Sequence, residues 1–198
     1  MNFNELRMLF IVVTGILVLI VASPGLSRVL VFPRSEFFTE VYLLGSSHLA
    51  EDYPFNITEG MNNSIYLGLG NQLGYCAYYQ VEVKFRNESM PGPSDSVASS
   101  LPSLYNITAV VADQAVYEVP LSFSFDYSVN ESVPQVVFNS MTFNNVALDL
   151  SGLPAAWNSS RSGCYGNLIF ELWIYNATTS PPFQYNQRAV WLWLNMTV

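Results

Sequence analysis

Histidine and cysteine, on which most protein metal centres depend, are nearly missing from this sequence. It contains one histidine, His48, and two cysteines, Cys76 and Cys164, in 198 residues. A structural zinc site takes four cysteine or histidine ligands, usually at short spacings, and the chain has no C-x-x-C pair. We therefore expect no zinc site.

Charged side chains are also scarce, at 11% of the residues, against about 25% in typical soluble domains. The chain contains seven basic and fifteen acidic residues, which gives a net charge of −8. Recognition of a phosphate backbone needs clustered lysine and arginine. The composition argues against nucleic acid as a partner and predicts a surface of neutral polar side chains.

The patterns of common catalytic sites are absent as well: no P-loop, G-x-G-x-x-G, H-E-x-x-H or G-x-S-x-G occurs. A Ser-His-Asp arrangement would have to use His48, which lies in a polar stretch that we interpret as a solvated loop. Glu51 and Asp52 are adjacent, so they point in opposite directions in an extended segment. We expect no enzyme, no catalytic residue and no cofactor, while a calcium site assembled from distant loops stays open.

Near the N-terminus the chain has one long apolar run, Met8 to Ala22, which contains no charge and a single polar residue, Thr14. As a helix it would span about 22 Å, between a secretory h-region and the roughly 30 Å of a membrane-spanning helix. Ser23-Pro24-Gly25 is expected to end it. Residues 1–25 are thus predicted to be a signal peptide or a membrane anchor, and the rest of the chain is predicted to be exported.

Asn-X-Ser/Thr sequons support this topology, because glycans are added on the exported side. All of them follow the apolar run, and none has proline in the middle position. We predict N-linked glycosylation, with ordinary turn asparagines as the alternative at any one site. The eight candidates are Asn56, Asn62, Asn87, Asn106, Asn130, Asn158, Asn176 and Asn195.

The two cysteines are predicted to form a disulfide, Cys76 to Cys164, because an even pair in an oxidising exterior usually does. The long loop that it closes would give a stabilisation of about 4–5 kcal/mol in the chain-entropy description. Two buried free thiols, or metal ligands, are the alternatives.

Beyond residue 37 the hydrophobic pattern has a period of two, which predicts β-strands. Tyr79, Val81, Val83 and Phe85, for example, alternate with polar residues. Turn clusters rich in Pro, Gly, Asn and Ser separate the segments. Seven to nine short strands predict an immunoglobulin-like antiparallel β-sandwich over residues 37–198. Further strands are expected at 39–44, 64–70, 105–112, 121–125, 136–150 with a break at Asn144-Asn145, 167–175 and 189–197.

Several short motifs stand out in the β-domain: TEVYLLG (39–45), AEDYP (50–54), LGLGN (67–71), YQVEV (79–83), ADQAVYEVP (112–120) and the two final strands, 168–175 and 188–194. The glycines of LGLGN lie within a predicted strand, where they mark a bulge or close sheet packing. Together the motifs resemble an archaeal family catalogued as domain of unknown function 1616. The resemblance implies an exported, membrane-associated β-domain over most of residues 37–198, and it brings no activity or site.

Tryptophans stand on the last two predicted strands, which are apolar on both faces. Trp191 and Trp193 alternate with Val190, Leu192 and Leu194, and Trp173 lies on the preceding strand. Either a loop, the membrane-proximal segment or glycans cover these rings, or Trp173, Trp191 and Trp193 form a contact surface for a partner.

Residues 26–36 form a short apolar link between the N-terminal run and the β-domain. Its core, Arg28, Val29, Leu30, Val31 and Phe32, is β-prone. Released by cleavage near residues 22–25, it would be a donor strand for the open sheet edge of the next copy, as in exported archaeal thread filaments. The alternatives are a stalk, or the first strand of its own domain.

Together these features predict a non-enzymatic, glycosylated cell-surface module with a structural or interaction role, anchored in the membrane through its N-terminal helix or secreted. Its expected partners are the membrane, N-linked glycans, and further copies or another surface protein. One alternative is a subunit of an extracellular filament assembled by strand addition. A second is an extracytoplasmic solute-binding or sensor module, which needs a concave pocket lined by polar groups.

Overall fold

The computed structural model describes residues 3–29, 36–130 and 134–197. The chain is mostly β, with 56% of it in strands, preceded by one apolar helix. It divides into two compact units, Met1–Glu36 and Phe37–Val198. The expected all-β class and N-terminal helix are confirmed.

Helix α1 (Phe3–Val29) is long and apolar enough from Phe3 to Ser23 to cross a membrane, and none of that stretch is buried. Its one polar side chain in the apolar run, Thr14, donates a hydrogen bond of 2.7 Å to the carbonyl of Phe10. The hydroxyl is therefore satisfied without water, as a hydrocarbon environment requires. A signal sequence at the N-terminus fits the same description.

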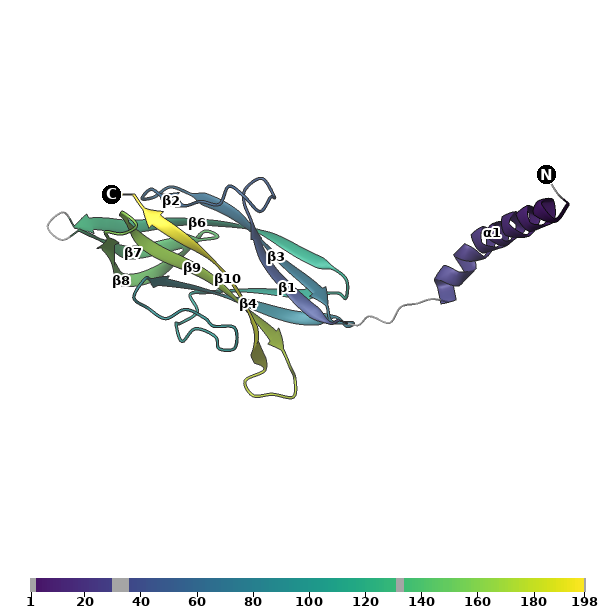
Figure 1. Cartoon of the computed structure of the whole chain (residues 1–198). Helices are drawn as coiled ribbons and strands as arrows, with labels where there is room; N and C mark the ends of the chain where they lie inside the picture. Colours follow the sequence, from purple (N-terminus) through teal and green to yellow (C-terminus); the bar gives the residue numbers. More distant parts are fainter. Residues whose placement is uncertain (1–2, 30–35, 131–133, 198) are drawn as a thin grey trace. The chain divides into compact units, whose positions relative to one another are not determined.

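The helix does not end at Ser23-Pro24-Gly25 as predicted, but continues to Val29. Proline removes one backbone hydrogen bond and bends a helix without always ending it, and the axis of α1 bends in its last turns (Figure 1). Arg28 and Val29 are consequently helical, which corrects their prediction as a β segment. Leu30, Val31 and Phe32 lie outside the described residues.

The described residues of the second unit form ten strands, and each expected strand is present with somewhat different ends. Asn144 and Asn145 both have positive φ and form the tight turn between β7 and β8, as the predicted break requires. The sequence did not indicate β2. The strands are β1 (Phe38–Leu44), β2 (Asn56–Ile57), β3 (Asn63–Gln72), β4 (Ala77–Asn87), β5 (Tyr105–Val111), β6 (Val116–Asn130), β7 (Gln135–Phe143), β8 (Val146–Asn158), β9 (Gly163–Tyr175) and β10 (Phe183–Met196).

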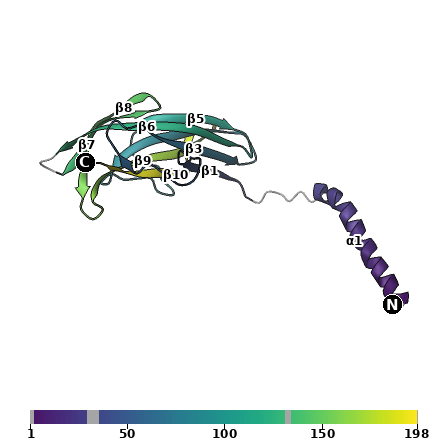
Figure 2. The same ribbon diagram turned by 90° about the horizontal axis from the view of Figure 1, so that it is seen from above.

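These strands belong to one sheet that curls over on itself like half a barrel (Figures 1 and 2). The order is β1-β3-β6-β7-β8-β9-β10-β2, with β4 paired to β9 and β5 to β4. All pairs are antiparallel except the short β10–β2 pair. The first half contains β1, β3, β6, β7 and β8, and the second contains β2, β4, β5, β9 and β10. Among the described residues the ladder joins them through two residue pairs between β8 and β9, Trp157 with Cys164 and Asn158 with Gly163.

An aromatic cluster packs between the two halves. The ring of Phe85 on β4 lies 5.0 Å from that of Phe125 on β6 and 4.8 Å from that of Phe138 on β7, centroid to centroid. Leu192 and Leu194 of β10 face the same core, as their alternation predicts. The burial of these side chains is what holds the curled sheet closed.

The LGLGN motif is structural. A Cβ on Gly68 would lie 2.1 Å from Cζ of Tyr42, so the ring occupies the space that a side chain would take. Fully buried Asn71 donates from Nδ2 to the carbonyls of Tyr75 and Val111, each at 2.8 Å. Its Oδ1 accepts from the Leu73 amide and the Tyr79 hydroxyl, each at 3.1 Å. One amide side chain thus ties the end of β3 to β4 and β5.

Loop 88–104 is fastened to the outer face of β4 and β9 by a buried ion pair. Nζ of Lys84 lies 2.8 Å from Oε2 of Glu171, and their side chains are 3% and 0% exposed. The Ser99 amide donates to Oε1 of Glu171 at 2.7 Å, and Lys84 donates to the Ser99 carbonyl at 3.0 Å. Glu82 adds a second carboxylate 3.1 Å from Nζ. The pair therefore has hydrogen-bond partners on both charged groups, which a buried pair needs.

Candidate functional site

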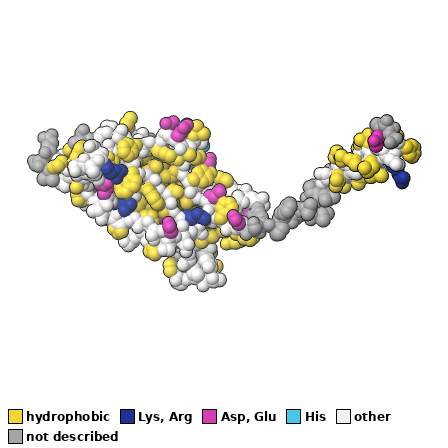
Figure 3. Space-filling view, in the orientation of Figure 1, with side chains coloured by type: hydrophobic (Ala, Val, Ile, Leu, Met, Phe, Trp, Pro, Cys, Tyr) yellow, Lys and Arg dark blue, Asp and Glu magenta, His cyan; other side chains and the backbone are white. Residues whose placement is uncertain are grey.

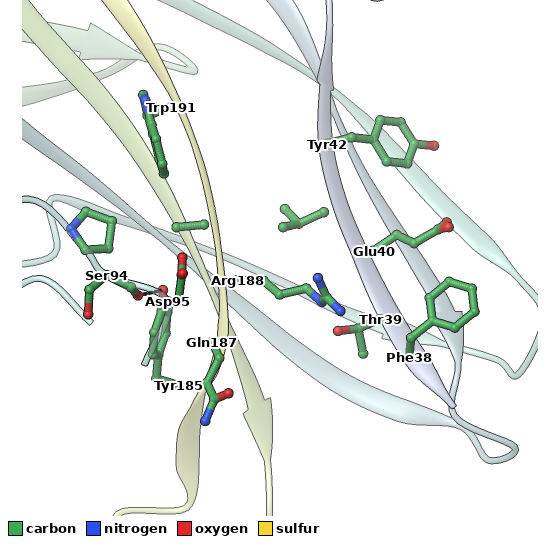
Figure 4. Close-up of a pocket in the computed structure, with 13 residues that line it drawn as sticks. Phe38, Thr39, Glu40, Tyr42, Ser94, Asp95, Tyr185, Gln187, Arg188 and Trp191 are labelled. Carbon is green, nitrogen blue, oxygen red and sulfur yellow. Dashed lines mark hydrogen bonds between the residues drawn. The ribbon is translucent and has the colours of Figure 1, made fainter. Parts of the chain in front are cut away.

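A groove runs between β1 and β10, where the curled sheet does not close. Within the described ranges β1 pairs with β3 alone, and β10 pairs with β9 and, at Asn195 and Met196, with β2. The two facing edges line two overlapping hollows of about 620 and about 540 Å³. Both hollows include Val41, Tyr42, Ala189 and Trp191, so they form one continuous feature. Figure 4 shows the first of them.

One end of the groove is polar. Glu40 of β1, Asp95 of loop 88–104 and Arg188 of β10 line it, and Arg188 extends from β10 toward β1 (Figure 4). Thr39 Oγ1 donates a hydrogen bond to Asn186 Oδ1 and so links the two strands at this end. Burial raises the pKa of Tyr185, with a smaller contribution from the carboxylates of Glu171 and Asp95.

The other end of the groove is apolar. Its walls are Leu43 of β1, Val190 and Leu192 of β10, and Ala50 and Tyr53 of the loop after β1. The Tyr53 hydroxyl donates to the carbonyl of Leu43 at 2.8 Å, so its polar atom is satisfied within the chain. The groove therefore changes from charged to hydrophobic along its length.

The three tryptophans of the predicted contact surface, Trp173, Trp191 and Trp193, do not share one environment. Lys84 Nζ lies 5.8 Å from the Trp173 ring, and the guanidinium carbons of Arg86 and Arg161 lie 5.1 and 5.6 Å from the Trp193 ring. These are cation–π contacts within the chain. Hydrophobic side chains on this face are accordingly interrupted by basic ones (Figure 3). Trp191 differs, because it is 50% exposed and lines the groove.

A family model described as "Domain of unknown function (DUF1616)" matches residues 33–135, which is just over half of the chain. The chain belongs to the DUF1616 family. The match covers β1 to β6 and the loop that bears Asp95, and it stops before β10. The matched region thus contains β1, one wall of the groove, but not β10, the other wall.

Similarity to other proteins is remote. No curated protein matches the DUF1616 chain. Solved structures of a beta-glucosidase from Listeria innocua resemble it with TM-scores of 0.37 for the enzyme alone and 0.36 for its isofagomine complex, at 7% and 6% identity. Each match covers 83% of this chain and 17% of the beta-glucosidase. Likeness this weak carries no argument about activity.

The structure places the DUF1616 chain's sequons in different environments. Asn56, Asn62, Asn106, Asn130 and Asn176 are exposed, Asn158 and Asn195 are half-buried, and Asn87 is buried. Nδ2 of Asn158 donates to both carboxylate oxygens of Glu88, and Nδ2 of Asn195 donates to Oδ1 of Asn56.

At Asn87 we expect no glycan. Its Nδ2, the atom that a glycan would modify, donates to the Pro154 carbonyl at 2.7 Å, and its Oδ1 accepts from the amides of Ser89 and Met90. Glycopeptide mass spectrometry of the native protein should find Asn87 bare and Asn62 or Asn176 modified. Asn87→Ala should cost about 1–2 kcal/mol of unfolding free energy, because the Pro154 carbonyl and the turn amides lose their partner. A glycan at Asn87 in the folded protein would contradict the structure.

The predicted disulfide is wrong in this structure: Cys76 and Cys164 are both free, the first exposed and the second buried. In the ladder Tyr79 lies opposite Ile174 and Asn87 opposite Gly166. Cys76, just before β4, and Cys164, on β9, therefore lie 13 residue steps apart along this register, which is about 40 Å at the usual rise per strand residue, whereas a disulfide needs Cα atoms within about 7 Å.

Thiol labelling of the unreduced, folded protein should modify Cys76 and spare Cys164. Burial raises the pKa of the Cys164 thiol, and its side chain is out of contact with solvent. We expect Cys76 to react with a maleimide at least about 100-fold faster, since Cys164 reacts only after opening of the fold. Cys164 should react fully in denaturant without reductant. If neither thiol reacts in denaturant until reductant is added, the two are bonded after all.

His48 belongs to a surface contact. Its Nδ1 lies 3.6 Å from Oε2 of Glu118, and its ring lies 3.6 Å from that of Tyr66. The Tyr42 hydroxyl donates to Oε1 of Glu118 at 3.0 Å, and burial together with this bond raises the pKa of Tyr42 to about 12.

Over the described ranges no group of three or more His, Cys, Asp and Glu is arranged to hold a metal ion. Sequence reasoning missed the groove, because its two walls are far apart in the chain: Thr39 and Asn186, which meet across it, are separated by 147 residues.

Proposed function

We propose that this DUF1616 protein is a non-enzymatic, glycosylated module displayed outside the cell, either anchored by α1 or released by cleavage, with a structural or interaction role. The observation that carries the proposal is the apolar stretch Phe3–Ser23, none of which is buried, and which suits a bilayer or an export signal. The five exposed sequons in the second unit support the same side of the membrane. Within this proposal the two facing halves of the sheet form an immunoglobulin-like sandwich. The motif resemblance supports an archaeal origin of the protein.

The test is to determine where the native protein lies and how it is processed. Protease added to intact cells should digest the second unit, and mass spectrometry should report glycans and show whether the N-terminus is Met1 or a residue near 22–25. A cytosolic marker protein that survives the same treatment is the control. Protection from the protease, together with bare asparagines, would overturn the proposal.

We propose as a second candidate function that the module assembles with further copies by strand addition. The groove supports this, because it presents two unpaired strand edges side by side. Exposed edges of this kind are templates for pairing with another chain. A solute-binding role is the competing use of the same groove, and a thermal shift with sugars or metal ions, absent with a Trp191→Ala variant, would favour it instead.

A further inference from the structure

At one end of the second unit, four strands carry a row of apolar side chains on one face of the sheet. Val110 of β5 is the cross-strand partner of Tyr78 of β4, and Phe183 of β10 is the partner of Tyr175 of β9. The Tyr78 ring lies 5.9 Å from the Tyr175 ring and 5.4 Å from the Phe183 ring, centroid to centroid. The row is therefore continuous across the four strands, and we call these four residues the terminal row.

The terminal row faces outward and is exposed. Tyr79, the neighbour of Tyr78 in the chain, is buried in the core, so Tyr78 lies on the outer face. Val110, Tyr175 and Tyr78 are 68%, 44% and 38% exposed. Single exposed apolar side chains are ordinary on a protein surface, whereas a contiguous group of them marks a contact. The next outward-facing residue of β4 is the polar Gln80, so on this strand the apolar group ends with the row.

The terminal row lies at the end of the second unit where the chain enters it. Phe38, the first residue of β1, is opposite Gln72 at the end of β3. The neighbouring Asn71 donates from Nδ2 to the carbonyl of Val111, the residue after Val110. One hydrogen-bonded side chain thus connects the entry of the chain with the terminal row.

Two more exposed rings lie beside the entry of the chain. Phe37 is 61% exposed and Tyr75 is 58% exposed. A Cβ on Gly74 would lie 2.9 Å from Cε1 of Phe37, so this ring packs against the loop between β3 and β4. A tyrosine ring has an apolar body and a polar hydroxyl, which suits the boundary between hydrocarbon and water. Tyr75, Tyr78 and Tyr175 are side chains of this kind.

We propose that the terminal row, together with Phe37 and Tyr75, contacts the surface of a lipid bilayer at the level of the headgroups. The inference rests on the anchored form of the proposed function, and it adds which surface of the second unit meets the membrane. In the chain this end follows the stretch Phe3–Ser23, which is long and apolar enough to span a bilayer. Residues 30–37 of the sequence connect α1 to β1. So short a connection gives the lipid a high effective concentration, and a weak contact is then sufficient.

The charges indicate that this contact is apolar and not electrostatic. Anionic lipid is bound by clustered lysine and arginine. The basic residues of the second unit all lie outside the terminal row; they are Lys84, Arg86, Arg161 and Arg188. Beside the entry of the chain, the carboxylate of Asp113 accepts a hydrogen bond of 2.8 Å from the Gly74 amide. Binding should therefore come from burial of apolar surface, which salt does not screen.

Quenching by a labelled lipid in the full-length protein tests the proposal. The protein, with Cys76→Ser, is reconstituted into phosphatidylcholine vesicles that contain a lipid with a nitroxide headgroup. A fluorophore is attached at Val110→Cys in one sample and, as control, at Val129→Cys in another, because Val129 is 40% exposed at the opposite end of β6. The buried thiol of Cys164 stays unlabelled in the folded protein. We expect quenching at Val110→Cys to be at least about fivefold stronger than at Val129→Cys, because only the first label lies at the headgroups.

The other outcomes of this experiment overturn the inference in distinguishable ways. Equal quenching at the two labels, in protein that sediments with the vesicles, removes the membrane contact and leaves the proposed function standing. A label at Val110→Cys that is shielded from aqueous iodide but not quenched by the lipid assigns the terminal row to a second copy of the chain. Protein that does not sediment with the vesicles removes the anchored form, and the inference with it.

Salt and substitutions in the terminal row give two further readouts. Raising the salt from about 0.05 to about 0.5 M should leave quenching at Val110→Cys unchanged, and a loss of quenching would show that charge, not apolar burial, makes the contact. Tyr78→Ser combined with Tyr175→Ser should lower this quenching at least about twofold, because it removes two of the rings that meet the lipid. Trp157→Ser, which removes an exposed ring next to the β8–β9 joint, should not change it. Equal quenching in both variants would overturn the role of the terminal row.

Discussion

Glu171→Ala should cost about 3–5 kcal/mol of unfolding free energy, because it leaves the ammonium of Lys84 buried without its main partner. The Glu171 side chain is 0% exposed and accepts from both Lys84 Nζ and the Ser99 amide. The variant therefore loses the anchor of loop 88–104 as well as the charge pair. Urea unfolding of the full-length protein in detergent, followed by tryptophan fluorescence, measures the loss.

The matched control is Glu88→Ala, which removes an exposed ion pair. Glu88 lies 2.7 Å from Arg161, and their side chains are 30% and 42% exposed. Exposed pairs contribute about 0–1 kcal/mol. Lys84→Met combined with Glu171→Leu should recover part of the stability, since both charges of the fully buried pair are then removed, while Glu82 and the Ser99 amide still lose a partner. If Glu171→Ala is no more destabilising than Glu88→Ala, the buried pair does not hold the loop.

Asn71→Ala should lower the unfolding free energy by about 3 kcal/mol, because two or more buried polar groups lose their partners at once. The Val111 carbonyl and the Tyr79 hydroxyl both bond to this amide inside the fold. Burial raises the pKa of Tyr79, so its hydroxyl stays protonated and remains a donor that needs an acceptor. The same urea titration applies.

Tyr79→Phe distinguishes the loss of the whole Asn71 network from the loss of one bond. It removes one hydrogen bond and leaves the other three of Asn71 in place. A neutral bond contributes about 1 kcal/mol. Asn106→Ala, on the exposed face of β5, should change stability by less than about 0.5 kcal/mol. Equal losses for Asn71→Ala and Tyr79→Phe would show that the amide does not join β3 to β4 and β5.

Local patterns in the sequence were sufficient for the strands and for part of their packing. Tyr79, Val81, Val83 and Phe85 are buried as their alternation requires, because the period of a strand is fixed by backbone geometry. The Asn144-Asn145 turn also follows from a local preference, since asparagine tolerates positive φ. The close packing expected at the LGLGN glycines is found at Gly68.

Features that depend on the register of the strands could not be predicted from the sequence. The pairing of Cys76 with Cys164 was inferred from compartment and number, yet the β4–β9 register sets them at opposite ends of a strand. Nor does any local pattern show that Lys84 meets Glu171, or that β1 comes to lie beside β10. The end of α1 was misplaced for another reason: tolerance of Pro24 depends on the whole helix, and a single proline does not fix it.

The two-rung joint between β8 and β9 has a mechanical consequence. In the ladder the halves are connected there by Trp157–Cys164 and Asn158–Gly163. Side-chain hydrogen bonds of Asn71, Asn87 and Tyr127, and of Thr39 across the groove, add further links between them. A rotation of one half about this joint would change the spacing of β1 and β10, and it would have to stretch these side-chain hydrogen bonds. The width of the groove therefore depends on how the aromatic core packs between the two halves, so that fluctuations of the core packing also change the width of the groove.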